Sequence, residues 1–230
     1  MTVSPAVHYE LAEGIASITL DDGKANVMSE RMQSELGSAL DRAESDGAVV
    51  LLRGRPRMFS GGYELAMFGR SPDEVARTIR AGALLVHRLL GFRRPVVALC
   101  TGHAVAQGAF LLLAADVRVG VASDFKIGLN EVAIGLTMPH YGVEISRLRL
   151  SAPGFNHATT TGALYEPEAA ARAGFLDHVV PGAEADRFAR EQALALTRIN
   201  AEAHANTKLR VRRFALEAMR AGIDADFASA

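Results

Sequence analysis

The sequence predicts an α/β fold, because short β-branched runs alternate along the chain with segments that repeat apolar residues at helical spacing. The clearest unit lies at residues 96–116. There an apolar run, 96–100, is followed by a turn of small residues and by a continuous apolar segment from about Gln107 to Asp116. This pattern indicates a buried strand, a tight turn and a buried helix. The chain has 230 residues, 49% of them apolar, and no linker rich in Pro, Gly or Ser. We therefore expect one main domain with a helical C-terminal extension.

The N-terminal third supplies the first strands and helix. Residues 7–11 and 14–20 have the composition of two paired strands, with 12–14 as their turn. Ser29 is placed to cap a helix whose apolar residues recur at helical spacing, and residues 49–53 form the next strand candidate.

The rest of the chain continues this alternation. Ser71-Pro72-Asp73-Glu74 has the form of a capping box with proline at the first helical position, and it predicts a helix that ends near Leu90. Further strands are expected at residues 117–122 and 125–127, and further helices at 166–174, 185–198 and 201–221.

Composition and charge exclude several classes of function. The net charge of −1 favours neither nucleic-acid binding nor an acidic tail. Cys100 is the single cysteine, which rules out an intramolecular disulfide and fits a reducing cytoplasm. No signal peptide begins the sequence, and no apolar run is long enough for a membrane span, so we expect a cytoplasmic protein without a membrane partner. The histidines show no metal-ligand spacing, and no serine-hydrolase elbow, P-loop or dinucleotide fingerprint occurs.

Two glycine-containing turns follow buried strands and are candidates for a site. The first, Phe59-Ser60-Gly61-Gly62, follows the strand at 49–53, and the second precedes the buried helix at Gln107. Free N–H groups at a helix start favour negative charge. If both turns direct amides at one oxygen, they form an oxyanion hole. Either turn alone is also explained by the need for a tight bend.

Five segments of the chain resemble the crotonase family, which comprises the enoyl-CoA hydratases and isomerases. They are ITLDDGKANVM at 18–28, FSGGYEL at 59–65, TGHAVAQGAFLLLAAD at 101–116, NEVAIGLTMP at 130–139 and AAARAGFLDHVV at 169–180. The resemblance implies a spiral of ββα turns at residues 1–183. It also implies a helical region at 184–230 that packs between the subunits of a homotrimer or a dimer of trimers.

The resemblance assigns catalytic roles to three residues. The backbone amides of Gly61 and Gln107 would hold the thioester oxygen, and Glu131 would move the proton. The family's triple glycine is here Ala106-Gln107-Gly108, so the Gln107 side chain is expected to narrow the acyl pocket. Apolar neighbours predict a raised pKa for Glu131, although its position is also that of an ordinary exposed loop acid.

Phe110 marks the main departure from the family, whose hydratases have a second glutamate at this position. Phenylalanine cannot activate water, and the loss of one acid–base group costs about 10²- to 10⁴-fold in rate. A single glutamate is what the family's isomerases use. The missing polar group could instead come from Tyr63, Glu64, His140, Tyr141 or Glu144. Glu144 is the main candidate for a substitute acid, although its position is more readily explained as that of a helix-surface or salt-bridging acid.

The family binds a coenzyme A thioester as its substrate and uses no cofactor. Arg55 and Arg57 lie in a loop that borders the CoA site in the family, and Lys208 resembles a lysine of a C-terminal helix that reaches a neighbour's ligand. The implied substrate-binding set is Lys24, Ala25, Gly62, Tyr63, Glu64, Gly108, Phe110 and Lys208.

The sequence therefore predicts an acyl-CoA enzyme, with enoyl-CoA hydratase as the family-level name. The first alternative is a Δ3,Δ2-enoyl-CoA isomerase that uses Glu131 as its sole base. The second is a non-catalytic acyl-CoA-binding trimer, suggested by Phe110 and the altered glycine run. Nucleic-acid binding through the basic helix near Arg210 has little support from the net charge.

Overall fold

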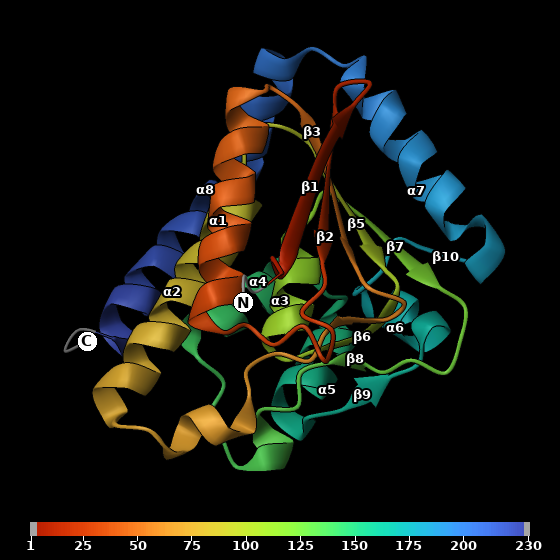
Figure 1. The fold of residues 1–230 in the computed structure, drawn as a ribbon. Coiled ribbons are helices and arrows are strands. Elements are labelled where there is room, and N and C mark those ends of the chain that lie inside the picture. The colour runs from red at the N-terminus through yellow and green to blue at the C-terminus, as the bar shows by residue number, and fades with distance from the viewer. Residues whose placement is uncertain (1–3, 228–230) are drawn as a thin grey trace.

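Two β-sheets build the fold of residues 4–227, the part of the chain that the computed structural model describes (Figure 1). The larger sheet has the order β1-β2-β3-β5-β7-β10 and is parallel except for the β1–β2 hairpin. The smaller sheet has the order β4-β6-β8-β9. The strands are β1 (Val7–Ala12), β2 (Ile15–Leu20), β3 (Val49–Gly54), β4 (Arg57–Ser60), β5 (Val96–Cys100), β6 (Gly102–Val105), β7 (Val117–Val121), β8 (Ile127–Gly128), β9 (Leu164–Tyr165) and β10 (His178–Val180).

Helices cover the larger sheet on both faces. Figure 1 shows α7 on one side, while α1, α2 and α8 lie on the other. Small residues of α7 let it pack closely on β3, β5 and β7, and α8 packs against α2 and α4. The helices are α1 (Glu30–Ser45), α2 (Pro72–Leu90), α3 (Gln107–Ala114), α4 (His140–Arg149), α5 (Ala152–Thr161), α6 (Pro167–Ala173), α7 (Gly182–Thr197) and α8 (Ala201–Asp226), with short 3-10 turns η1 (Leu65–Gly69) and η2 (Val132–Ile134).

The predicted α/β fold is confirmed, and the local signals that predicted helix starts are present in the structure. The Ser29 hydroxyl accepts a hydrogen bond from the Met32 amide at 3.2 Å, and Ser71 forms the expected capping box with Glu74. The fully apolar α3 is buried along its whole length, as its sequence predicts. Neither α3 nor any other helix within residues 4–227 has both the length and the apolar character needed to cross a bilayer.

Three predicted boundaries differ from the structure. The strand expected at 125–127 is only Ile127–Gly128, because the Lys126 amide donates to the His103 side chain instead of to a backbone carbonyl of β6. Residues 102–105, expected as a loop, form β6 and pair with β4. Helix α8 continues beyond residue 221 to Asp226. The division of the chain at residue 183 into a core and an extension stays a prediction.

Candidate active site

The two turns identified in the sequence lie against each other. Gly62 has a φ of 83° and a methyl group at its Cα would lie 2.9 Å from the Val105 carbonyl oxygen and 3.4 Å from the Gln107 nitrogen. Glycine is therefore required here, both for its positive φ and for the close approach of the backbones. The turn after β4 and the N-terminus of α3 are in this way held side by side.

The Gly61 amide is not free to bind a substrate oxygen. Its N–H donates to the Ala25 carbonyl at 2.9 Å, which ties the turn after β4 to the loop after β2. The expectation that Gly61 is an oxyanion donor is corrected on this ground. By contrast, the N–H of Tyr63 has no hydrogen-bond partner within residues 4–227, and neither has the N–H of Gln107 at the first position of α3.

The Gln107 side chain is buried, and both ends of its amide are hydrogen-bonded. Its Oε1 accepts the Tyr141 hydroxyl at 2.7 Å, and its Nε2 donates to the Gly82 carbonyl at 2.8 Å. These bonds tie the start of α3 to α4 and to α2. The residue before it, Ala106, has a φ of 51°, so the turn is strained and is held by its surroundings.

Glu131 opens η2 and is only 7% exposed. Burial raises its pKa to about 7, which confirms the expected direction. Its Oε2 has no hydrogen-bond partner in the described part of the chain. A carboxylate of this kind is able to exchange a proton near neutral pH.

Two cavities meet at Glu131. A smaller one of about 180 Å³ extends toward Gly61 and Ala106, and a larger one of about 320 Å³ extends past Gln107 toward the end of α8. Glu131 and Tyr63 line both. The other residues of the larger cavity are mostly apolar: Phe68, Ile79, Leu136, Thr137, Met138, Pro139, His140, Tyr141, Asp226 and Phe227.

Phe110, the position of the missing glutamate, does not line either cavity. It is buried, and its ring packs edge-on against Tyr141 at a centroid distance of 5.3 Å. Glu144 also lies away from both cavities and pairs with Arg147 at 3.7 Å, as expected for a salt-bridging surface acid. Neither residue therefore adds a polar group beside Glu131.

Other members of the predicted substrate-binding set have different roles in the structure. Gly108 is needed for packing, because a methyl group there would lie 2.3 Å from the Ser60 carbonyl oxygen. Glu64 precedes η1 and lines a separate groove beside α1. Lys24 is exposed, and its carbonyl accepts a hydrogen bond from Arg55. None of these three lines the two cavities that meet at Glu131.

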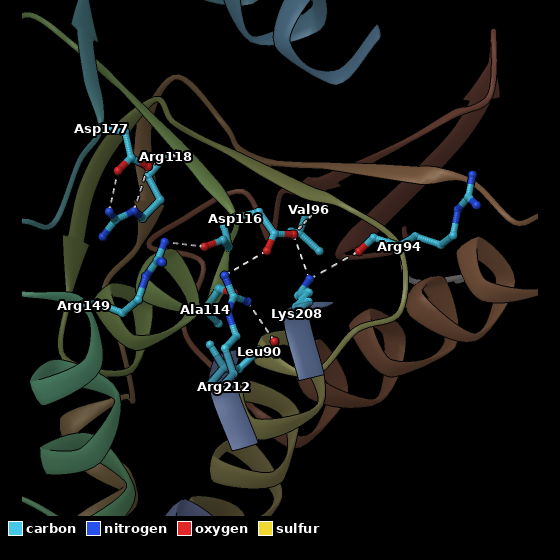
Figure 2. A network of polar contacts seen from close by, with 11 residues as sticks. Leu90, Arg94, Val96, Ala114, Asp116, Arg118, Arg149, Asp177, Lys208 and Arg212 are labelled. Carbon is cyan, nitrogen blue, oxygen red and sulfur yellow. Dashed lines mark hydrogen bonds and ion pairs between the residues drawn. The ribbon is translucent and has the colours of Figure 1, made fainter. Parts of the chain in front are cut away.

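Lys208 was expected to reach a neighbour's ligand, and the structure contradicts this expectation. Its side chain is 4% exposed and its Nζ lies 2.7 Å from Asp116, inside the molecule. Figure 2 shows Lys208 and Arg212 converging on this carboxylate, whose other oxygen lies 2.8 Å from Arg212. The basic residues of α8 at these two positions therefore tie α8 to the segment between α3 and β7.

Sequence reasoning missed the groups that complete the larger cavity. Asp226 and Phe227, at the end of α8, lie beyond the helix predicted from the sequence. The sequence suggests a role for the Tyr63 side chain, whereas its position directly after two glycines is the signal that its amide is left without a partner among the described residues. Burial raises the pKa values of both Tyr63 and Tyr141, so these phenols are neutral.

Comparison with known proteins adds a family and several relatives. Residues 10–228 match the family model described as enoyl-CoA hydratase/isomerase. A protein of Bacillus subtilis named probable enoyl-CoA hydratase is 30% identical over 57% of this chain, and the chain spans about half (52%) of that relative's length.

Solved structures share the fold along the whole chain. A family member from Pseudomonas syringae has a TM-score of 0.96 and 42% identity, with 99% of each chain covered. A structure described as the enoyl-CoA isomerase of Mycobacterium tuberculosis has a TM-score of 0.94 and 40% identity, covering 98% of this chain and 99% of that one. The relatives thus include proteins with both a hydratase name and an isomerase name.

Proposed function

Because the chain belongs to the enoyl-CoA hydratase/isomerase family, we propose that it is an enzyme that moves the double bond of a 3-enoyl-CoA thioester to position 2. One observation carries this proposal. Glu131 is a buried carboxyl group with an unpartnered oxygen, and Phe110 leaves it without the second glutamate that hydration uses. A single base is sufficient for isomerisation, because the proton that leaves one carbon returns to another.

The proposed mechanism places the thioester oxygen between the amides of Tyr63 and Gln107. Glu131 removes a proton from C2, the electron pair forms a dienolate whose negative charge rests on that oxygen, and the same carboxyl group returns the proton to C4. Each amide is expected to contribute roughly 3 kcal/mol of transition-state stabilisation. The reaction only moves a proton and a double bond within the substrate, so it needs no oxidant, reductant or added water.

This mechanism predicts a rise of kcat/KM with pH. A carboxyl group must be ionised to accept the C2 proton, and the raised pKa of Glu131, about 7, means that it is mostly protonated at lower pH. We expect kcat/KM to fall about tenfold for each pH unit below this value and to level off above it. Initial rates measured across the neutral range test this. A flat profile through that range would show that the base has an ordinary glutamate pKa.

Hydration of a 2-enoyl-CoA is the second candidate function, since relatives such as the Bacillus subtilis protein have a hydratase name. Two tyrosine hydroxyl groups line the cavity near Glu131, but Tyr63 donates to the Ile79 carbonyl and Tyr141 to Gln107. Both are therefore poorly placed to activate water in the second glutamate's place.

The two reactions are separated by their products. Purified protein is incubated with a 3-enoyl-CoA and, separately, with crotonyl-CoA, and the products are resolved by mass. We expect 2-enoyl-CoA from the first substrate and little 3-hydroxyacyl-CoA from the second. Efficient hydration of crotonyl-CoA without isomerisation would reverse the assignment. Binding of acyl-CoA without turnover of either substrate would support the non-catalytic alternative.

The homotrimer, or dimer of trimers, remains part of the proposal. Helix α8 carries two large apolar side chains that are mostly exposed in the single chain, Val211 at 70% and Phe214 at 72%. Burial of such side chains favours association.

A further inference from the structure

The far wall of the larger cavity is built where α8 ends and α4 begins. The cavity is lined by Glu131 and Gln107 in its interior and by His140, Asp226 and Phe227 from these two helix ends. His140 lies 86 positions before Asp226 in the sequence and Phe227 directly follows Asp226, but all three line the same end of the cavity. The wall therefore exists only while the end of α8 is docked on the start of α4.

Asp226 holds the two helix ends together. Its Oδ2 accepts the His140 backbone N–H at 2.8 Å, and its other carboxylate oxygen contacts the His140 ring. Pro139 precedes α4 and provides no side-chain cap, so the carboxylate from α8 takes the place of the missing cap. A negative charge at a helix N-terminus is also favoured by the helix dipole.

The close approach of the two helices depends on Gly222. A methyl group at this position would lie 2.6 Å from the His140 Cβ. The Asp226 side chain is 20% exposed while the His140 side chain is 71% exposed, so the pair lies at the border between the cavity and solvent. The His140 ring faces solvent and the Asp226 carboxylate faces the cavity, so their contact lies at the outer limit of the cavity.

We propose that the Asp226–His140 contact and the Phe227 side chain form the wall that limits the length of the acyl chain, so that the enzyme is specific for short-chain 3-enoyl-CoAs. This inference rests on the proposed function. The cavity volume of about 320 Å³ is at the lower end of the roughly 300–1,000 Å³ found for ligand sites. A longer chain meets a hydrogen-bonded carboxylate and imidazole, and this pair loses its hydrogen bonds if it is displaced.

The test compares kcat/KM for 3-hexenoyl-CoA and 3-hexadecenoyl-CoA in the wild type and in Asp226→Ala. One methylene that does not fit its pocket costs about tenfold or more in kcat/KM. We expect the wild type to favour the short substrate at least about tenfold, and Asp226→Ala to reduce that preference by about tenfold. An unchanged ratio in a folded Asp226→Ala protein would overturn the proposal. If Asp226→Ala does not fold, the same ratio is measured in Phe227→Ala. The proposal predicts a reduced preference for the short substrate there, and an unchanged ratio would overturn it.

A matched control separates the wall from general loosening of α8. Arg220→Gln removes an exposed ion pair with Asp224, 3.0 Å long, near the same end of the helix, and Arg220 does not line the cavity. This variant is expected to keep the wild-type ratio. An equal shift in Arg220→Gln would overturn the assignment of the wall to Asp226.

Failure of the proposed function can be distinguished from failure of this inference. If the wild type isomerises no member of the series, the proposed function fails. The wall is then tested by the affinities for hexanoyl-CoA and palmitoyl-CoA, which need no turnover. The proposal predicts that Asp226→Ala improves palmitoyl-CoA binding relative to hexanoyl-CoA binding by about tenfold, and equal relative affinities in the two proteins would contradict it.

Discussion

Replacement of Glu131 by glutamine is expected to lower kcat for isomerisation by about 10²- to 10⁴-fold. Glutamine has nearly the same shape as glutamate but cannot accept the C2 proton. The variant should fold, because the buried position no longer carries an acid whose ionised form is penalised by burial. Single-turnover rates with a 3-enoyl-CoA and calorimetric affinity for a saturated acyl-CoA separate chemistry from binding, and the affinity should be unchanged.

Glu144→Gln is the matched control for this variant. Glu144 was the sequence-based candidate for a substitute acid, and in the structure it pairs with Arg147 outside the cavities. Its replacement should leave the rate within a factor of about two, because Glu144 lies outside the cavities and a partly exposed ion pair contributes little to stability. A Glu131→Gln protein with near wild-type kcat would remove the proposed base, and a large loss in Glu144→Gln would return Glu144 to the site.

Gly62→Ala is expected to lower kcat/KM by about 10²- to 10³-fold, the usual effect of losing one oxyanion donor. The added methyl group would press on the Val105 carbonyl oxygen at 2.9 Å and approach the Gln107 nitrogen at 3.4 Å. The positive φ of Gly62 is also unfavourable for alanine. The two turns must then separate, and the amides of Tyr63 and Gln107 no longer fit one oxygen. Steady-state kinetics, with circular dichroism as the check on folding, measure the effect.

The neighbouring glycine provides the control. A methyl group at Gly61 would be 3.4 Å from the Ala25 carbonyl oxygen, and Gly61 does not have a positive φ. Gly61→Ala should therefore lose clearly less activity than Gly62→Ala. The reverse order would favour the original assignment of the donor to Gly61 over the assignment to Tyr63.

Much of the fold was predictable because its signals are local. Ser29 and Ser71 cap helices through bonds to residues within three positions in sequence, and the apolar run of α3 is long enough to indicate burial by itself. Strands β4 and β6 gave no such signal. They are four residues long, contain glycine or arginine, and are fixed by pairing with each other across more than forty positions.

The site was predictable only where the chemistry of a residue follows from residues close to it in sequence. The raised pKa of Glu131 follows from the apolar residues beside it. The amide of Gly61 and the side chain of Lys208 were misassigned because their partners, Ala25 and Asp116, are distant in sequence. A motif identifies which turn belongs to a site, but the hydrogen bonds of the folded chain decide which amide in that turn is free.

The central claim is that Glu131 alone carries the proton from C2 to C4. It is tested most directly by isomerisation of a 3-enoyl-CoA that carries deuterium at C2, in ordinary water, with deuterium in the product located by NMR. Because Glu131 is buried, exchange of its proton with solvent should be incomplete during the transfer. We predict that part of the deuterium appears at C4 of the 2-enoyl-CoA. If the deuterium removed from C2 is lost entirely to solvent, with none at C4, transfer by one buried carboxyl group is contradicted.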